Sequence, residues 1–200
     1  MDSGTASLST VAFPPAANRA KEKASSLGAP RMQRLILMRH GETERPAPAL
    51  KDFDRALEAE GREESRRIGR ALAKAGLGPD LIIVSGARRT AQTGEAVAEA
   101  FSGVTVQADD SLYEASPARL AEAVRDAAPR ATALMLIGHN PSIHLYALQL
   151  ARQAGASTSG VRSPFDSFPT GTAAVFALQP GRRPAFERLF LARDYRTDAP

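Results

Sequence analysis

Cysteine is absent from the 200 residues of this chain. Its absence excludes disulfide bonds, a thiolate nucleophile and a thiolate metal site. Long apolar runs are missing too, and no stretch approaches the about 20 residues that a membrane-spanning helix needs. The formal net charge is +4, but dense Lys/Arg blocks are also lacking, because the Arg residues interleave with Glu and Asp. We therefore expect neither a membrane nor a nucleic acid as a partner.

The first 31 residues differ in composition from the rest. Ala, Ser, Pro and Gly dominate them, without a sustained apolar period, which predicts a disordered leader over residues 1–31 and a single domain over residues 32–200. Met32 directly precedes the first expected strand and is an alternative start residue. The leader lacks the apolar core of a secretory signal, and Asp2 and Glu22 argue weakly against an organellar presequence. We expect a cytoplasmic protein.

Short apolar runs alternate with helical patterns along the rest of the chain. The expected strands are Leu35–Met38, Leu81–Val84, Val104–Val106, Leu134–Ile137, Ala173–Leu178 and Phe186–Ala192. The expected helices are Leu57–Ala75, a helix from Arg89 to about Phe101, one that Ser116 and Pro117 open, and one that Asn140 and Pro141 open. This alternation predicts an α/β fold, a three-layer α/β/α sandwich around a mostly parallel central sheet.

Basic side chains follow three of the expected strands at the point where each strand ends. Arg39 and His40 follow the first strand, Arg88 and Arg89 the second, and His139 the fourth. Each alone has an ordinary explanation, either a solvated surface arginine or a core histidine. In a parallel sheet, however, all three places lie at the same edge, and two of them also open helices, whose N-termini attract anions. One guanidinium group can bind two phosphate oxygens at once. The basic residues at this edge therefore predict a site for a phosphoryl group.

Three segments together resemble the histidine phosphatase superfamily, the phosphoglycerate mutase-like group. They are Leu37–Thr43, Ser85–Thr93 and Gly138–Asn140. Two further segments, Asp52–Leu57 with Gly61-Arg62 and Phe168–Gly171, resemble the SixA-type phosphohistidine phosphatases within that superfamily. Two motifs depart from the SixA pattern. The motif Arg-His-Gly-Glu-Thr is closer to that of the mutases, and Gly86 stands where a proline is expected.

The resemblance implies a catalytic domain with His40 as the nucleophile and with Arg39, Arg89 and His139 as phosphate-binding residues. It implies no metal and no cofactor. Glu114 is the candidate proton donor to the leaving group, but SixA-type enzymes work without such an acid, so Glu114 is equally well an ordinary loop residue. The implied partner is a phosphorylated substrate, a phosphohistidine protein in the SixA-like case. A small-molecule phosphatase or mutase and a non-catalytic phospho-ligand-binding module stay open, as does the oligomeric state.

Loop length favours a large substrate. The stretch from Gln107 to Ser116 is short, and the other potential cover, Gly155–Pro169, is polar and of moderate length. Neither is long enough to predict a closed lid over a small metabolite. We therefore expect an open, shallow pocket that accepts a phosphoryl group carried on a protein.

Overall fold

The computed structural model describes residues 32–158 and 165–195. The predicted leader lies outside the described residues, as does part of the loop Gly155–Pro169. The strands are β1 (Arg34–Arg39), β2 (Leu81–Ser85), β3 (Thr105–Asp109), β4 (Ala133–Gly138), β5 (Thr172–Ala177) and β6 (Ala185–Leu191). The helices are α2 (Ala59–Lys74), α3 (Arg88–Ala98), α4 (Pro117–Ala127) and α5 (Ser142–Gln153). Short 3-10 turns are η1 (Asp52–Asp54), η2 (Asp110–Leu112), η3 (Ala128–Arg130) and η4 (Ala192–Tyr195).

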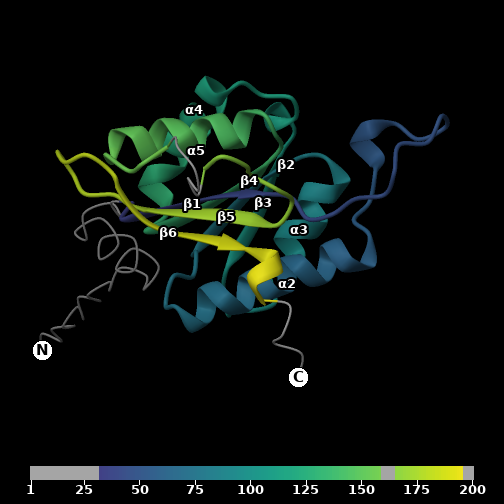
Figure 1. The fold of residues 1–200 in the computed structure, drawn as a ribbon, viewed down its shortest axis with the longest axis horizontal. Coiled ribbons are helices and arrows are strands. Elements are labelled where there is room, and N and C mark those ends of the chain that lie inside the picture. Colours follow the sequence, from purple (N-terminus) through teal and green to yellow (C-terminus); the bar gives the residue numbers. More distant parts are fainter. Residues whose placement is uncertain (1–31, 159–164, 196–200) are drawn as a thin grey trace, which may run out of the picture.

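The six strands form one sheet in the order β3-β2-β4-β1-β5-β6. Strands β1 to β4 are parallel to one another, whereas β5 is antiparallel to β1 and to β6. Figure 1 shows the sheet between two helical layers, with α4 and α5 on one face and α2 and α3 on the other. The predicted three-layer α/β/α fold with a mostly parallel sheet is confirmed.

The apolar runs form the centre of the sheet because both of its faces are covered. Leu35 and Leu37 point into the core beneath α4 and α5, whereas Ile36 and Met38 point into the core beneath α2 and α3. Successive side chains of a strand point to opposite faces. A strand buried on both faces therefore reads as an uninterrupted apolar run, which is why β1, β2 and β4 were recognisable.

Two of the predicted element boundaries were wrong because of main-chain pairing. The strand expected at Val104–Val106 extends to Asp109, so the expected loop from Gln107 begins inside β3. Main-chain pairing with β2 forms the added part of this exposed edge strand, which no apolar pattern marks. Helix α2 begins two residues after Leu57, because Leu57 pairs with Thr43 in an isolated bridge.

The two predicted helix starts with proline had different outcomes. Ser116 is the N-cap of α4, and its hydroxyl accepts a hydrogen bond from the Arg119 amide at 3.2 Å. Asn140 does not cap α5: the helix begins at Ser142 with Pro141 at the N-cap position. The Asn140 side chain is instead engaged elsewhere, donating to the Phe168 carbonyl at 2.9 Å.

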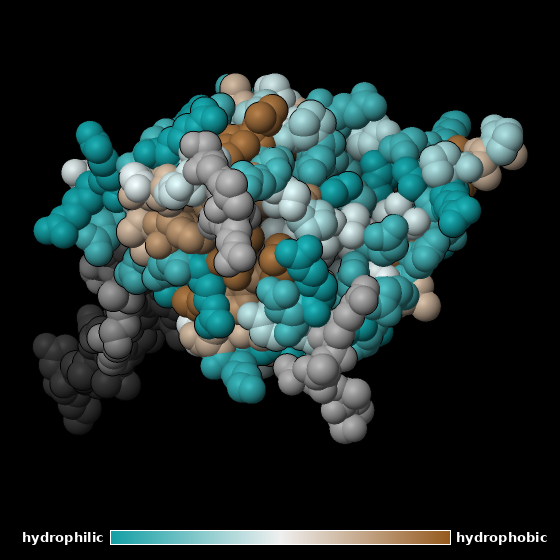
Figure 2. Space-filling model, in the orientation of Figure 1, coloured by the Kyte–Doolittle hydropathy of each residue, from teal (hydrophilic) through white to brown (hydrophobic). Residues whose placement is uncertain are grey.

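The surface fits the composition. Hydrophilic side chains cover most of the face seen in Figure 2, with smaller apolar patches between them. Among residues 32–158 and 165–195, no helix is both long and apolar enough to cross a membrane.

Candidate active site

The carboxyl ends of β2, β4 and β1 lie side by side, because these strands are neighbours in the sheet. His40 directly follows β1 and His139 directly follows β4. Their rings are in contact, with centroids 5.2 Å apart and planes tilted by 57°. The structure therefore brings the two predicted histidines together at one edge of the sheet.

The ring of His40 is held in one tautomer. His40 is only 8% exposed, and its Nδ1 lies 2.8 Å from the carbonyl oxygen of Gly41. A carbonyl oxygen can only accept, so Nδ1 carries the hydrogen and donates it. In the neutral ring Nε2 then bears the lone pair, as a nucleophilic nitrogen requires.

The pKa values of both histidines lie well below the usual value. Burial lowers the pKa of His40 to about 4, against the opposing effect of the hydrogen bond to Gly41 and with further lowering by Arg89 and Arg39. Burial also lowers the pKa of His139 to about 3, and the charge of Arg89 contributes. Both rings are therefore neutral near pH 7, and His40 keeps its lone pair there.

We expect His40 to titrate near pH 4 in the folded protein. Because its pKa is lowered, the ring is neutral above that pH and gains a proton only as the pH falls through it. The chain holds 3 histidines, so ring resonances followed by 15N-correlated NMR between pH 3 and 8 can be assigned with His40→Asn. A midpoint for His40 near the ordinary value of 6.5 would contradict the burial described above.

His139 is oriented by the end of β2. Its Nε2 lies 2.9 Å from the hydroxyl oxygen of Ser85. Its Nδ1 is shielded from solvent and has no hydrogen-bond partner among the described residues. When the Ser85 hydroxyl donates to Nε2, Nδ1 carries a hydrogen that is available to a ligand.

Arg39 reaches the site from the last position of β1. Its Nη1 donates to the Phe168 carbonyl at 3.0 Å, the same oxygen that accepts from Asn140. Burial lowers the pKa of Arg39, but an arginine stays charged in a protein. Its buried Nε has no partner among the described residues. Buried donors are normally satisfied, so this N–H is a further group available to an anion.

Arg89 is the most strongly held of the predicted residues. Its Nη2 donates to the Asp52 carboxylate at 2.8 Å, and its Nη1 donates to the Asp52 carbonyl. The same carboxylate accepts from Tyr113 at 2.9 Å and from Arg55 at 2.8 Å. The hydrogen bond from Arg55, with those from Tyr113 and Arg89, holds the pKa of Asp52 well below its usual range. Asp52 is thus ionised at neutral pH and fixes the guanidinium of Arg89 beside the histidines.

Glu114 lies at the mouth of the site. It is exposed, has a positive φ of 55° and lines a cavity of about 400 Å³ together with Arg89, His139, Asp52 and Tyr113. No hydrogen bond holds its carboxylate among the described residues. The structure therefore places Glu114 next to the phosphate-binding candidates without fixing its side chain.

The loop that carries His40 packs directly against the start of α2. A Cβ on Gly41 would collide with the carbonyl of Gly61, and a Cβ on Gly61 would collide with the main chain of Glu42. The amide of Gly41 also donates to the hydroxyl of Thr93 at 3.2 Å. Two glycines thus allow backbone-to-backbone contact that fixes the position of His40 from two helices.

The residues that sequence reasoning missed are those that hold the predicted ones. Ser85, Asp52 and Tyr113 position His139 and Arg89, and the Phe168 carbonyl positions Arg39. Ser85 had a recognisable signal, a polar residue at the end of an apolar strand. Asp52 lay in a segment noted only for resemblance, and nothing in its spacing indicated a partner 37 residues away.

Metal ligands do not gather at this edge. His139 precedes α5 and His144 lies within it, and His144 is engaged by the Phe165 carbonyl at 2.8 Å. Within residues 32–158 and 165–195, no group of three or more His, Cys, Asp or Glu residues could hold a metal ion.

A neutral, oriented histidine lies among arginines at the carboxyl ends of the parallel strands, an arrangement that suits a phosphoryl group. Residues 35–149 match the histidine phosphatase superfamily (branch 1). The match covers more than half of the chain, so the protein belongs to this superfamily and is a phosphatase.

Relatives with known structures place the chain near the SixA group. A structure from Agrobacterium tumefaciens, assigned as the phosphohistidine phosphatase SixA, is 27% identical with a TM-score of 0.67, and the match covers 80% of this chain and 98% of that one. A second structure assigned as SixA, from Nakamurella multipartitia, is 25% identical with a TM-score of 0.67, and the match covers 80% of this chain and 95% of that one. An uncharacterised protein of Mycobacterium tuberculosis is 29% identical over 143 residues, 70% of this chain and 87% of its own length. The predicted SixA-like resemblance is confirmed.

Proposed function

We propose that this phosphatase works without a metal, forms a covalent phosphohistidine on Nε2 of His40, and acts on phosphohistidine proteins. The observation that carries the proposal is the hydrogen bond from Nδ1 of His40 to the Gly41 carbonyl. It leaves the lone pair on Nε2, and the lowered pKa keeps that lone pair free at neutral pH.

The reaction has two displacements. In the first, Nε2 of His40 forms a bond to phosphorus while the bond from phosphorus to the leaving group breaks. In the second, water attacks the same phosphorus, the bond to Nε2 breaks, and inorganic phosphate leaves with His40 restored. Each step needs positive charge and N–H donors around the three equatorial oxygens, because negative charge spreads over them in the transition state.

Arg39, Arg89 and His139 would supply those donors. A guanidinium has five N–H groups, and two of those on Arg89 bind Asp52, so others are left for phosphate. Nε of Arg39 and Nδ1 of His139 add buried donors without partners among the described residues. The two arginines would take the role that a metal ion has in other phosphoryl-transfer sites.

The open cavity and the unfixed carboxylate of Glu114 suit a substrate whose leaving group is an imidazole. Between β3 and α4 the chain forms only η2 and a short turn, which leaves the cavity beside His139 open to a phosphate carried on a protein. Phosphohistidine releases its imidazole readily, so an acid fixed near the scissile bond is unnecessary. The exposed, unfixed carboxylate of Glu114 agrees with that requirement.

A small-molecule phosphomonoesterase is the second candidate, and the position of Glu114 is the observation that favours it. The carboxyl group lines the same cavity as Arg89 and His139. An alcohol leaves with a proton, and a carboxylic acid at this place could donate it.

Glu114→Gln separates the two candidates. We expect the variant to keep its rate, within about threefold, on a phosphohistidine protein, because a positioned acid contributes about 10²–10⁴-fold only where the leaving group needs one. The matched control is Glu95→Gln, an exposed carboxylate on α3. Rates are measured on a phosphohistidine protein and on a panel of sugar and glycerate phosphates, with chelator present. Turnover of the small esters at the rate of the phosphoprotein, together with loss of activity in Glu114→Gln, would favour the second candidate.

We expect Asp52→Asn to weaken substrate binding, because Arg89 loses the carboxylate that positions it. The amide keeps the shape of the carboxylate but loses the charge that holds two guanidinium groups, so we expect kcat/KM to fall by about tenfold, mainly through KM. Asp54→Asn, at the other end of η1 and exposed, is the matched control and should stay near wild type. Equal effects of the two substitutions would show that only the overall charge of η1 matters.

A further inference from the structure

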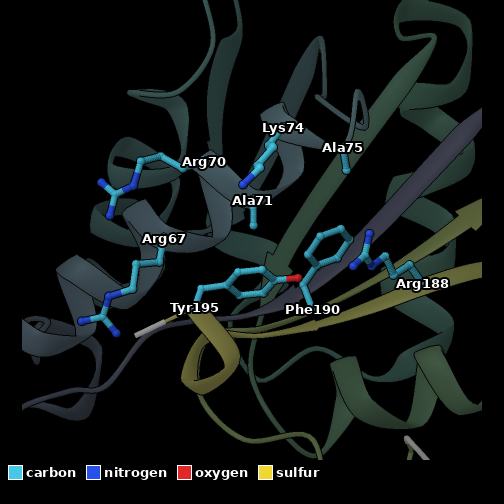
Figure 3. A pocket seen from close by; sticks show the side chains of 8 residues that line it. All are labelled: Arg67, Arg70, Ala71, Lys74, Ala75, Arg188, Phe190 and Tyr195. Carbon is cyan, nitrogen blue, oxygen red and sulfur yellow. The ribbon is translucent and has the colours of Figure 1, made fainter. Parts of the chain in front are cut away.

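A second pocket lies away from the candidate active site, between α2, β6 and η4 (Figure 3). We call it the basic pocket. Its defining side chains are Arg67, Arg70, Lys74, Arg188, Phe190 and Tyr195. Its volume is about 460 Å³, within the range of small-molecule sites. It shares no lining residue with the cavity beside Arg89 and His139.

The basic pocket has more positive than negative charge. Arg67, Arg70 and Lys74 lie on one face of α2, because residues three and four apart are neighbours on a helix. Arg67 pairs with Glu60 at 3.0 Å and Arg70 pairs with Glu63 at 2.7 Å. Lys74 and Arg188, from two different elements, have no acidic partner within the described part of the chain. An anion that reaches both would supply the missing charge.

A donor in the wall of the pocket is also unsatisfied. The side chain of Arg67 is 11% exposed, and its Nη1 is shielded from solvent without a hydrogen-bond partner among residues 32–158 and 165–195. Most buried polar groups in folded proteins have a partner. Arg67 therefore has one donor that its partners on α2 leave unpaired.

The pocket also has a flat aromatic side. Tyr195 stacks on Phe190 with centroids 6.0 Å apart and planes inclined by 26°, and the Arg188 guanidinium lies 5.0 Å from the centre of the Phe190 ring. Phe190 is buried and Tyr195 is half-buried, so Tyr195 offers the accessible ring. Figure 3 shows Lys74 and Arg188 approaching the two rings from different sides.

We propose that the basic pocket binds a nucleotide, a nucleoside diphosphate in the simplest case. The base stacks on Tyr195, and the phosphates lie between Lys74 and Arg188. Cations on two elements suit two phosphate groups, of which an arginine binds one through its planar fork and a lysine binds the other as a point charge. A planar ring and adjacent phosphates are the two features that this combination of side chains recognises.

The test is calorimetric titration with α,β-methylene-ADP, whose bridged phosphates resist hydrolysis. We expect one molecule to bind per chain. Lys74→Ala with Arg188→Ala should weaken binding by about tenfold or more, because two charge-assisted contacts are lost. The matched control is Arg152→Ala with Arg182→Ala, which removes the same charge from another exposed basic surface and should change the affinity less than about twofold.

Two simpler probes separate the base from the phosphates. Adenosine and methylenediphosphonate should each bind at least about tenfold more weakly than α,β-methylene-ADP, because each lacks one of the two recognised features. Tyr195→Leu should weaken α,β-methylene-ADP and leave methylenediphosphonate unchanged.

Four outcomes would overturn the proposal: no binding, equal losses in the two double variants, adenosine binding as tightly as the nucleotide, or binding that depends on Arg89 rather than on Lys74 and Arg188. The last would place the nucleotide in the candidate active site. Phosphatase activity is measured separately on each variant, so failure of nucleotide binding and failure of the proposed function are distinguishable.

Discussion

His40→Ala is expected to lower turnover by at least about 10³-fold on every substrate, because it removes the nucleophile of the first displacement. Wild-type protein quenched during turnover should carry one labelled phosphoryl group per chain, stable in alkali and labile in acid, as a phosphorus–nitrogen bond is. The His40→Ala protein should carry none. Rates and label are measured with 32P-labelled substrate in the presence of chelator.

The control substitutes another histidine, His144, which lies outside the candidate active site. His144 lies on α5, where its ring stacks on Phe168 with centroids 5.5 Å apart and its Nε2 meets the Phe165 carbonyl. His144→Gln retains a group that can donate to that carbonyl and should keep activity within about threefold. Persistent label or turnover in His40→Ala, or activity abolished by chelator in the wild type, would contradict the proposed mechanism. A protein that binds phosphate without turnover would be a binding module instead.

The second large effect is expected from Arg89→Lys. An ammonium group cannot reproduce the planar fork that holds Asp52 while donating to phosphate, so we expect kcat/KM to fall by about 10²–10³-fold. Inhibition by inorganic phosphate should weaken in parallel, since the same N–H groups bind it.

Arg88→Lys is the matched control. Arg88 precedes Arg89 in α3 and is exposed, whereas the Arg89 side chain is 7% exposed. The Arg88→Lys substitution should leave kcat/KM and the inhibition by inorganic phosphate close to wild type. A larger loss in Arg88→Lys than in Arg89→Lys would show that the wrong member of the pair had been assigned to phosphate.

The sequence was sufficient to predict the sheet and the residues at its edge. Leu35–Met38 and Leu134–Ile137 are buried on both faces, and such strands leave an apolar run that is visible without coordinates. The order of basic residues after those strands then placed His40 and His139 at one edge, where their rings meet. The roles of these residues in catalysis stay predictions.

Other features depend on contacts that the local sequence does not encode. Most residues of β3 are exposed, so no hydrophobic pattern reveals that pairing with β2 carries this strand beyond Val106 to Asp109. Asn140 precedes a helix and a proline, as an N-cap does, but the Phe168 carbonyl offers a partner 28 positions along the chain. Asp52 likewise contacts Arg89 only because η1 and the start of α3, which are distant in sequence, meet at one edge of the sheet.

The position of β1 divides the site into two parts with different tolerance to change. β1 lies between β4 and β5 with both faces covered, so we expect the strand that precedes His40 to be among the last parts of the domain to open. Asp52 belongs instead to a short exposed turn outside the sheet. Substitutions or insertions around η1 are therefore expected to be tolerated only where they leave Asp52 in contact with Arg89.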